Sequence, residues 1–349
     1  MGILKGNVTF SLFEIQNRDG GKIQPDEYYQ RLRAHAFRGI FPDAAEKGIG
    51  WTSIHNVLDS GFATEPTGDD RFRMFAMRVD RRAIPAAVIK MRCLEEEARL
   101  KADTGQKKLY REQRDGIRES IRINLQKAIP ATPRVYDVAW DTEKGLVYLG
   151  SITPSVIDDF TSLMNETFGI ILVPVMAKVD LPPGGIDPLT IGLEFLTWLW
   201  FKSEERGGVI SVPGLGDIEM HFFRRVDLAA GEGEFAESVC CQGWHADLKE
   251  AKEALRQGKK VAEARIGLFR DRDAFEFTAC ANRYQYKTMK LPPVDVEDEA
   301  DQAGADLERM FLIGKAAETM GFLYGHFITL LGSAEWPDER VKMIQWLQR

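Results

Sequence analysis

The sequence predicts an α+β fold, a multi-subdomain arrangement of antiparallel sheets and long helices. Strand patterns and helix patterns are grouped along the chain instead of alternating strictly, which favours α+β over a parallel α/β sheet. A chain of 349 residues is too long for one small hydrophobic core, and a composition of 44% hydrophobic and 28% charged residues is that of a globular protein. We expect three regions: 1–180, an α+β region with a basic helical pair at 85–128; 181–294, a second α+β region; and 295–349, a helical segment.

The first region contains both kinds of pattern. Alternation of apolar and polar residues predicts strands at 7–15 and 71–76, and 170–175 is expected to be a short buried strand. The hairpin turn Thr142-Glu143-Lys144-Gly145 indicates strands at 134–141 and 145–151. Helices are predicted at 25–37, which Pro25-Asp26-Glu27 opens, at 85–103 and 106–128, and at 154–168, which Pro154 opens. Asp103-Thr104-Gly105 separates the two middle helices, and Pro130 and Pro133 end the second.

The rest of the chain begins after Leu181-Pro182-Pro183-Gly184-Gly185, the clearest break in the sequence. A helix through Phe195 and Trp200 follows, and strands are predicted at 216–228, 236–243, 260–270 and 273–281. Asp247-Leu248-Lys249-Glu250 is a capping box that opens a short helix, which Gly258 ends. A long apolar helix at 305–332 and a last helix at 337–348 complete the prediction.

Several classes of protein are disfavoured by the residues present. The four cysteines form no C-x-x-C pair, so neither a zinc site nor a disulfide framework is indicated. The first residues lack the pattern of a secretory signal, and no apolar run is long enough to span a bilayer. We expect a cytoplasmic protein with no membrane contact, no metal and no cofactor.

The charges are distributed unevenly along the chain. The formal net charge is −7, yet residues 71–134 hold 17 Lys/Arg against 8 Asp/Glu, a net of +9 that leaves −16 for the rest. A chain with this asymmetry can bind a polyanion at one place and remain acidic elsewhere.

The most basic stretch is KKLYREQRDGIRESIRINLQK, residues 107–127. On a helix, five of its cations fall within roughly 80° of one another, and an apolar and an acidic face flank them. These cations are Lys107, Arg111, Arg114, Arg118 and Arg122. Two interpretations remain open: a solvated helix face with i,i+4 ion pairs, or a surface that contacts the phosphates of a nucleic acid.

Patterns that indicate catalysis are weak. The five histidines form no H-E-x-x-H, H-x-E or H-x-H motif, and no P-loop is present. Consecutive acids such as Glu95-Glu96-Glu97 point in different directions on a helix, so they do not make a two-metal nuclease site by themselves. We therefore expect no catalytic residue and no enzyme activity.

Several stretches, taken in order, resemble the recombination-associated RdgC family. They are Gly48-Ile49-Gly50-Trp51, Ile84-Pro85-Ala86-Ala87-Val88-Ile89-Lys90, the charged helical pair from Leu94 to Lys127, Trp140-Asp141-Thr142-Glu143-Lys144-Gly145-Leu146-Val147, Val173-Pro174-Val175, Leu196-Thr197-Trp198, the run from Leu248 to Leu291, and the apolar helix from Phe311 to Leu331. One departure is the connection after Ile129-Pro130, which is short and has no Phe.

The resemblance implies a nucleoid-associated, ring-shaped homodimer that encircles double-stranded DNA without sequence preference and restrains the RecA recombinase by competing for DNA. The family is also labelled as an exonuclease, so the resemblance extends that label to this chain. With this resemblance the expected DNA-binding residues are Lys107, Lys108, Arg111, Arg114, Arg118, Arg122, Arg71, Arg73, Lys259 and Lys260. Alternatives are a DNA exonuclease and a protein-interaction scaffold that does not bind DNA.

Overall fold

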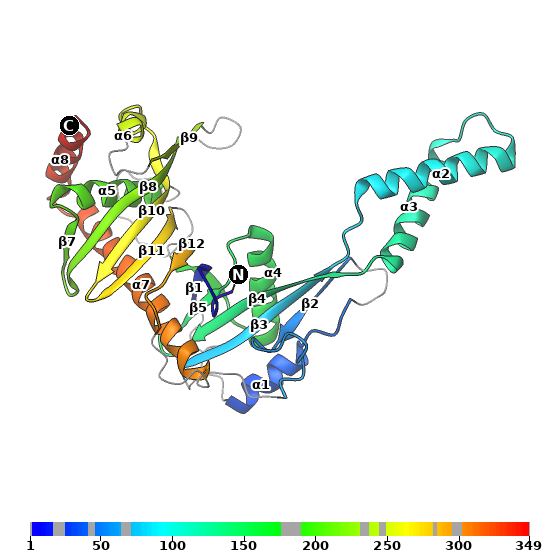
Figure 1. Ribbon diagram of the computed structural model, residues 1–349, viewed down its shortest axis with the longest axis horizontal. Coiled ribbons are helices and arrows are strands. Elements are labelled where there is room, and N and C mark those ends of the chain that lie inside the picture. The colour runs from blue at the N-terminus through cyan, green and yellow to red at the C-terminus, as the bar shows by residue number, and fades with distance from the viewer. Residues whose placement is uncertain are drawn as a thin grey trace. The chain divides into compact units, whose positions relative to one another are not determined.

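The computed structural model describes residues 2–16, 25–40, 46–63, 71–175, 190–230, 237–243, 249–281, 285–294 and 302–348. These residues contain eight helices and a large antiparallel sheet, so the predicted α+β class is confirmed (Figure 1). The chain forms two compact units. Unit 1 comprises Met1–Lys22, Thr67–Met74 and Asp137–Arg349, and unit 2 comprises Ile23–Pro66 and Phe75–Tyr136. The region boundaries expected at 180/181 and 294/295 lie at the segments 176–189 and 295–301, outside the described residues.

Unit 1 is built on antiparallel strands in the order β4-β5-β1-β12-β11-β10-β8-β7, with β6 paired to β1 and β9 paired to β8. The strands are β1 (Val8–Ile15), β4 (Thr132–Asp141), β5 (Leu146–Leu149), β6 (Leu172–Pro174), β7 (Val209–Val212), β8 (Gly216–Ala230), β9 (Glu237–Gln242), β10 (Lys260–Arg270), β11 (Asp273–Cys280) and β12 (Gln285–Lys290). β4 begins in unit 2 and ends in unit 1, because the boundary falls after Tyr136.

Helices α4 (Pro154–Phe168), α5 (Ile191–Glu205), α6 (Lys249–Arg256), α7 (Gln302–Leu331) and α8 (Trp336–Gln348) bury the apolar residues of this unit. α5 packs on β7, β8 and β10, and both α7 and α8 pack on α5. Aromatic rings fill these contacts: Phe13 meets Phe160 under α4, and Trp198 meets Phe327 between α5 and α7. The core of unit 1 therefore joins the sheet to α4, α5 and α7.

Unit 2 contains α1 (Pro25–Ala34), β2 (Lys47–Thr52), most of β3 (Phe72–Arg81), α2 (Ala86–Thr104) and α3 (Arg111–Ala128). β2 and β3 pair antiparallel, and the rings of Trp51, Phe75 and Tyr28 pack edge to face beside them. A Cβ at Gly50 would lie 2.5 Å from Phe37 Cα, so only glycine fits at this position of β2. Close packing against Phe37 thus explains the second glycine of the Gly-x-Gly-Trp stretch.

The structure agrees with most predicted elements. It adds β2, β7 and β12, which the patterns did not indicate, and it shortens α1 to end at Ala34. The second basic helix begins at Arg111 and not at 106, so Lys107 and Lys108 precede it. The first two residues of the predicted capping box, Asp247 and Leu248, and the break at 181–185 lie outside the described residues.

Candidate nucleic-acid interface

The basic segment of the sequence forms a helical hairpin, α2 and α3, which lie side by side beyond β2 and β3 (Figure 1). Gly105 ends α2 with a φ of 67°, a left-handed conformation that glycine adopts without strain. Gln113 Oε1 accepts a hydrogen bond of 2.9 Å from the backbone N–H of Tyr110 and so caps the start of α3. Local capping therefore fixes both ends of the connection.

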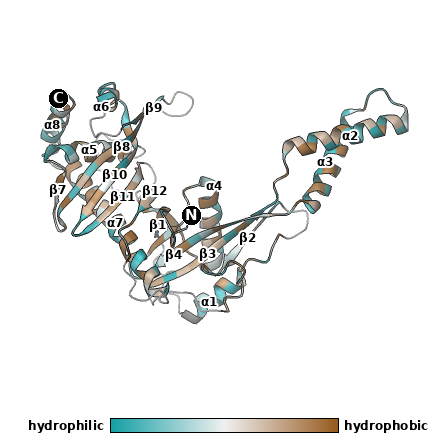
Figure 2. Cartoon of the chain, viewed as in Figure 1, coloured by the Kyte–Doolittle hydropathy of each residue, from teal (hydrophilic) through white to brown (hydrophobic). Residues whose placement is uncertain are grey.

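The hairpin has almost no core of its own. No residue of α2 is buried, and in α3 only Gln126 is. Met91 and Leu94 on α2 are 59% and 54% exposed. Figure 2 shows hydrophobic residues on both helices, and several of them, including Val88 and Ile123, are exposed. The apolar face predicted for the basic segment consists of Tyr110, Ile117, Ile121 and Leu125. The last three are half-buried, whereas Tyr110 is 73% exposed.

A groove of about 640 Å³ runs between α2 and α3. Its lining combines apolar residues with four cations and two carboxylates. The lining residues are Ala86, Ile89, Lys90, Cys93, Leu94, Glu97, Arg111, Arg114, Asp115 and Arg118. Three of the predicted cations thus share one concave surface, and Lys90 from α2 joins them.

Within this groove, the cations differ in how their charge is balanced. Arg111 Nε lies 3.7 Å from Asp115 Oδ2, an i,i+4 ion pair in which both side chains are largely exposed. Arg114, Arg118 and Lys90 are exposed and form no ion pair with any residue that the structure describes. Because Arg114 and Arg118 are like charges at i,i+4, they repel each other mildly, and a bound anion would relieve that repulsion.

Arg122, one turn further along α3, is held by Glu46. The Arg122 guanidinium donates to Glu46 Oε1, and Gln126 Nε2 donates to the same oxygen over 2.9 Å. The hydrogen bond and charge of Arg122 lower the pKa of the Glu46 carboxyl. Arg122 therefore anchors the end of α3 to the residue before β2, and a nucleic acid would have to compete with Glu46 for it.

Lys107 and Lys108 lie in the connection between the helices. Both side chains are exposed, whereas the next residue, Leu109, is 8% exposed and turns inward. The prediction that Lys107 lies on the helix with the arginines is wrong, because the helix begins only after the cap at Tyr110. Both lysines remain available at the end of the hairpin.

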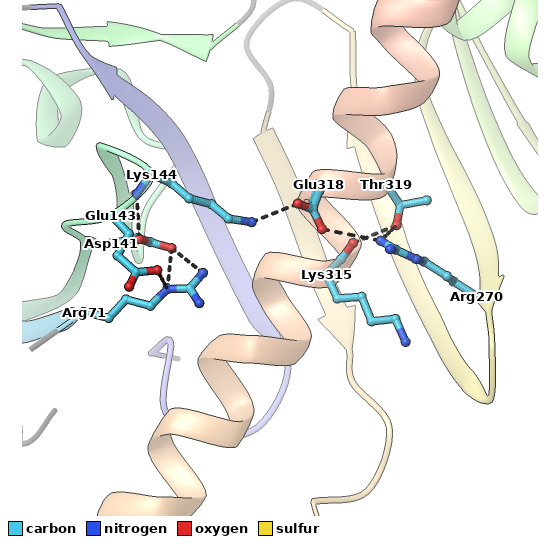
Figure 3. A network of polar contacts seen from close by, with 8 residues as sticks. All are labelled: Arg71, Asp141, Glu143, Lys144, Arg270, Lys315, Glu318 and Thr319. Carbon is cyan, nitrogen blue, oxygen red and sulfur yellow. Dashed lines mark hydrogen bonds and ion pairs between the residues drawn. The ribbon is translucent and has the colours of Figure 1, made fainter. Parts of the chain in front are cut away.

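Arg71 and Arg73 belong to unit 1, where they meet β4. Arg71 Nη2 donates to Asp141 Oδ2 over 3.0 Å, and its Nε lies 3.4 Å from Glu143 (Figure 3). The Arg73 guanidinium lies 5.8 Å from the centroid of the Trp140 ring, within cation–π distance. The charge of Arg71 is thus compensated inside the unit.

Lys259 and Lys260 also belong to unit 1, at the start of β10. Lys259 is 8% exposed, and its Nζ lies 2.7 Å from Glu237 Oε2. Lys260 Nζ lies 3.1 Å from Glu194 Oε1 on α5. Each lysine has a carboxylate partner, so neither presents an uncompensated charge in this structure.

Sequence reasoning missed Lys90. It belongs to the stretch that carries the family resemblance, but its contribution to the groove depends on how α2 packs against α3. Lys90 and Leu94 are four residues apart, and so are Ala86 and Lys90, a helical spacing that places all three on one face. That spacing is the signal that could have found it.

Two further findings concern the described residues. They contain no group of three or more His, Cys, Asp and Glu side chains arranged to hold a metal ion. None of the helices described is both long and apolar enough to cross a membrane.

Comparison with known proteins adds the family. Residues 10–182 match the family model described as "Putative exonuclease, RdgC". The chain belongs to the RdgC family. A comparison with curated proteins gives no match. The RdgC match contains the whole α2/α3 groove together with Arg71 and Arg73, whereas Lys259 and Lys260 lie beyond it.

Proposed function

We propose that this chain binds double-stranded DNA without sequence preference through the α2/α3 groove. Membership in the RdgC family implies a recombination-associated protein related to nucleic acids. The observation that carries the proposal is the exposed set Lys90, Arg114 and Arg118, which share one groove and have no ion pair among the described residues.

The charges of the groove suit phosphate better than bases. Arginine presents a planar fork of donors that matches phosphate oxygens, and lysine adds a mobile point charge. Contacts of this kind position a protein on the duplex but read no sequence. From Arg111 to Arg118 the helix rises about 10 Å, and duplex DNA presents one phosphate per about 1.7 Å of its axis, so several cations can each meet a phosphate.

The remaining cations extend this proposal. Lys107 and Lys108 lie at the end of the hairpin, and Arg122 follows the groove along α3. Arg71, Arg73, Lys259 and Lys260 would need to exchange their present partners for phosphate, so we rank them below the groove.

The ring and the cellular role rest on the family alone, whereas a feature of the hairpin also bears on whether the chain assembles. We propose a ring-shaped homodimer that encircles the duplex, associates with the nucleoid and competes with RecA for DNA. The nearly coreless hairpin supports an assembly of some kind, because its exposed Met91 and Leu94 would be covered by a partner surface.

A pair of double variants tests the DNA proposal. Arg114→Ala/Arg118→Ala removes two unpaired cations from the groove. Arg92→Ala/Arg99→Ala removes two exposed cations from α2 that already face carboxylates, Arg92 at 3.0 Å from Glu95 and Arg99 at 3.8 Å from Glu96. Both variants change the net charge equally, so they separate the groove from overall charge.

The measurement is the salt dependence of duplex binding, followed by fluorescence anisotropy. Each phosphate neutralised contributes about −0.9 to the slope of log K against log salt, so the groove variant flattens the slope by about 1.8 and the control leaves it unchanged. Equal slopes for wild type and groove variant would remove the hairpin from the interface. Equal changes in both variants would assign the effect to net charge.

The two alternatives give different results in the same samples. An exonuclease shortens end-labelled linear duplex in the presence of a divalent metal, and a chelator stops it; this reading is favoured only by the description of the family model. A protein-interaction scaffold shows no salt-sensitive binding to linear or circular duplex at any salt concentration.

A further inference from the structure

Unit 1 contains a cavity of about 630 Å³ that no part of the proposed DNA contact uses. It lies between α7 and the face of β1 and β5 that carries Leu12, Leu146 and Tyr148. On the α7 side, Gly314 and Ala317 line it. The volume is within the range of about 300–1,000 Å³ that small-molecule sites occupy in proteins, and apolar side chains make up most of the lining.

Glycines on α7 keep this cavity open. Glycine is less favourable than alanine inside a helix, yet Gly314 and Gly325 both lie within α7 and line the cavity. A Cβ added at Gly325 would meet no atom within 4 Å, and one added at Gly314 would lie 3.7 Å from the hydroxyl oxygen of Tyr148. Packing within this chain therefore does not require glycine at either position, and the space stays unfilled.

Tyr148 is the polar side chain of the β5 wall of the cavity. Tyr148 is 2% exposed, and its hydroxyl forms no hydrogen bond with any residue that the structure describes, although it points toward Gly314 on α7. The hydroxyl faces the open space of the cavity and is therefore available to donate to a bound molecule. Burial raises the pKa of Tyr148, so the group stays a neutral phenol that can donate a hydrogen bond.

The charged groups at the rim are already balanced. Lys144 Nζ lies 2.9 Å from Glu318 Oε1, and Arg270 Nη1 lies 3.5 Å from the other oxygen of Glu318 (Figure 3). At another part of the lining, burial lowers the pKa of His326, which keeps its ring neutral near pH 7. The cavity therefore offers an ionic ligand no uncompensated charge.

We propose that this cavity binds a small, uncharged and mainly apolar molecule that places one acceptor oxygen on the Tyr148 hydroxyl. The apolar walls supply the burial, and the phenol supplies the single directional contact. The proposal concerns unit 1 only and does not depend on DNA binding.

Two probes of similar shape test it on the full chain. Acetophenone carries a carbonyl oxygen, and isopropylbenzene replaces it with a methyl group; saturation-transfer NMR gives the affinity of each. We expect Tyr148→Phe to weaken the binding of acetophenone about three- to ten-fold, the effect of one net hydrogen bond. The same substitution should leave the affinity for isopropylbenzene unchanged, because that probe has no acceptor oxygen.

Filling the cavity provides the second arm. Gly314→Leu places a large side chain beside Tyr148 and weakens both probes at least ten-fold, whereas Gly314→Ala adds only an ordinary contact and retains binding. Circular dichroism and the unfolding midpoint show that each variant is folded.

Four results would overturn the proposal. Three of them concern the probes: neither probe binds up to its solubility limit, Gly314→Leu binds both probes as the wild type does, or Tyr148→Phe weakens acetophenone no more than it weakens isopropylbenzene. A fourth is a fall in sedimentation mass in Gly314→Leu, because the cavity would then be a contact between two copies of the chain.

Discussion

The two units of this chain differ in how far their positive charges are compensated. Unit 1 has 27 Lys/Arg and 39 Asp/Glu, a net charge of −12, and unit 2 has 19 and 14, a net charge of +5. In unit 1, Lys315 Nζ lies 2.7 Å from both Asp271 and Asp273, and Arg265 Nη2 lies 2.6 Å from Glu276. In unit 2, Arg114 and Arg118 face solvent without such partners among the described residues.

This difference separates cations whose ion pairs stabilise the fold from cations that are available to bind a ligand. A carboxylate within hydrogen-bonding distance of a lysine or arginine cancels most of the electric field of that cation, so the cation attracts a phosphate only weakly. An exposed pair of like charges has the opposite effect, since it attracts counterions that a polyanion can replace. The location of a basic residue in the sequence is thus less informative than the presence of its partner.

The largest expected effect tests whether the hairpin lacks a core. Leu323→Ala in α7, where Leu323 is fully buried, should lower the free energy of unfolding by about 2–5 kcal/mol. Leu94→Ala in α2, where Leu94 is 54% exposed, should change it by less than about 0.5 kcal/mol. Chemical denaturation measures both. A comparable loss in Leu94→Ala would show that an assembly buries α2, and the contrast between the units would fail.

The next largest expected effect is the difference in stability lost when an acidic side chain is removed from each unit. Asp141 is 1% exposed and accepts hydrogen bonds from Arg71 and from the backbone N–H of Lys144, so Asp141→Ala should cost about 1–3 kcal/mol. Asp115→Ala in α3 removes an exposed partner of Arg111 and should cost less than about 0.5 kcal/mol.

Thermal unfolding followed by circular dichroism provides the measurement for both carboxylates. Asp141→Asn is the matched control, because it keeps an acceptor for the Lys144 N–H. The reverse order, with Asp115 the more costly loss, would mean that unit 2 depends on its ion pairs and unit 1 does not.

Replacing two glycines of the hairpin should change its stability by smaller amounts, and in opposite directions. Gly116 lies inside α3, and an added Cβ meets no atom within 4 Å, so Gly116→Ala should stabilise the helix by about 0.5–1 kcal/mol. Gly105 has a φ of 67°, so Gly105→Ala should destabilise the hairpin by about 1 kcal/mol. Hydrogen exchange of α2 and α3 amides reports the opening free energy of this part alone. The same sign for both variants would contradict the capping geometry.

Much of the fold follows from local patterns. The strands around 270–273, the helix at 154–168 and the break at Gly105 are signalled by residues within a few positions, so sequence predicts them. The pairing of β1 with β12, which joins Val8 to Met289, depends on contacts between distant parts of the chain that no local pattern encodes. The same holds for β2, whose short Gly-rich run has weak alternation.

The candidate site was predictable to a similar degree. Helical spacing alone brings Arg111, Arg114 and Arg118 together, because they lie on one element. The carboxylates of Glu46 and Glu237 could not be anticipated as partners of Arg122 and Lys259, since they come from other elements. Basic residues are visible in a sequence, whereas their neutralisation is a property of tertiary structure.

The smallest expected effect is a change in the pH dependence of the stability of unit 1. Burial lowers the pKa of His326, the charge of Lys202 lowers it further, and Glu339 and Glu335 oppose this change. Since the folded state disfavours the protonated ring, the unfolded chain binds the extra proton first, and stability falls as the pH drops below about 6.5. His326→Gln should remove this part of the loss.

The measurement is the unfolding free energy of wild type and His326→Gln at about pH 7.5 and about pH 5.5. The carboxyls of unit 1 with lowered pKa values, such as Glu339, lose their contribution only at lower pH, as the pH falls below their ordinary range. An identical pH dependence in the variant would show that His326 is solvated in the folded protein.

The position of Cys93 gives the α2/α3 groove a chemical reporter of its own. Cys93 lines the groove beside the arginines, whereas the exposed Cys240 lies on β9 of unit 1, where a hydrogen bond with Asp227 raises the pKa of its thiol. Burial raises the pKa of Cys280 to about 12 and so keeps that thiol unreactive. Alkylation by iodoacetamide should slow at Cys93 and not at Cys240 when a duplex fills the groove. Mass spectrometry of the native chain can therefore read occupancy as a ratio of two alkylation rates.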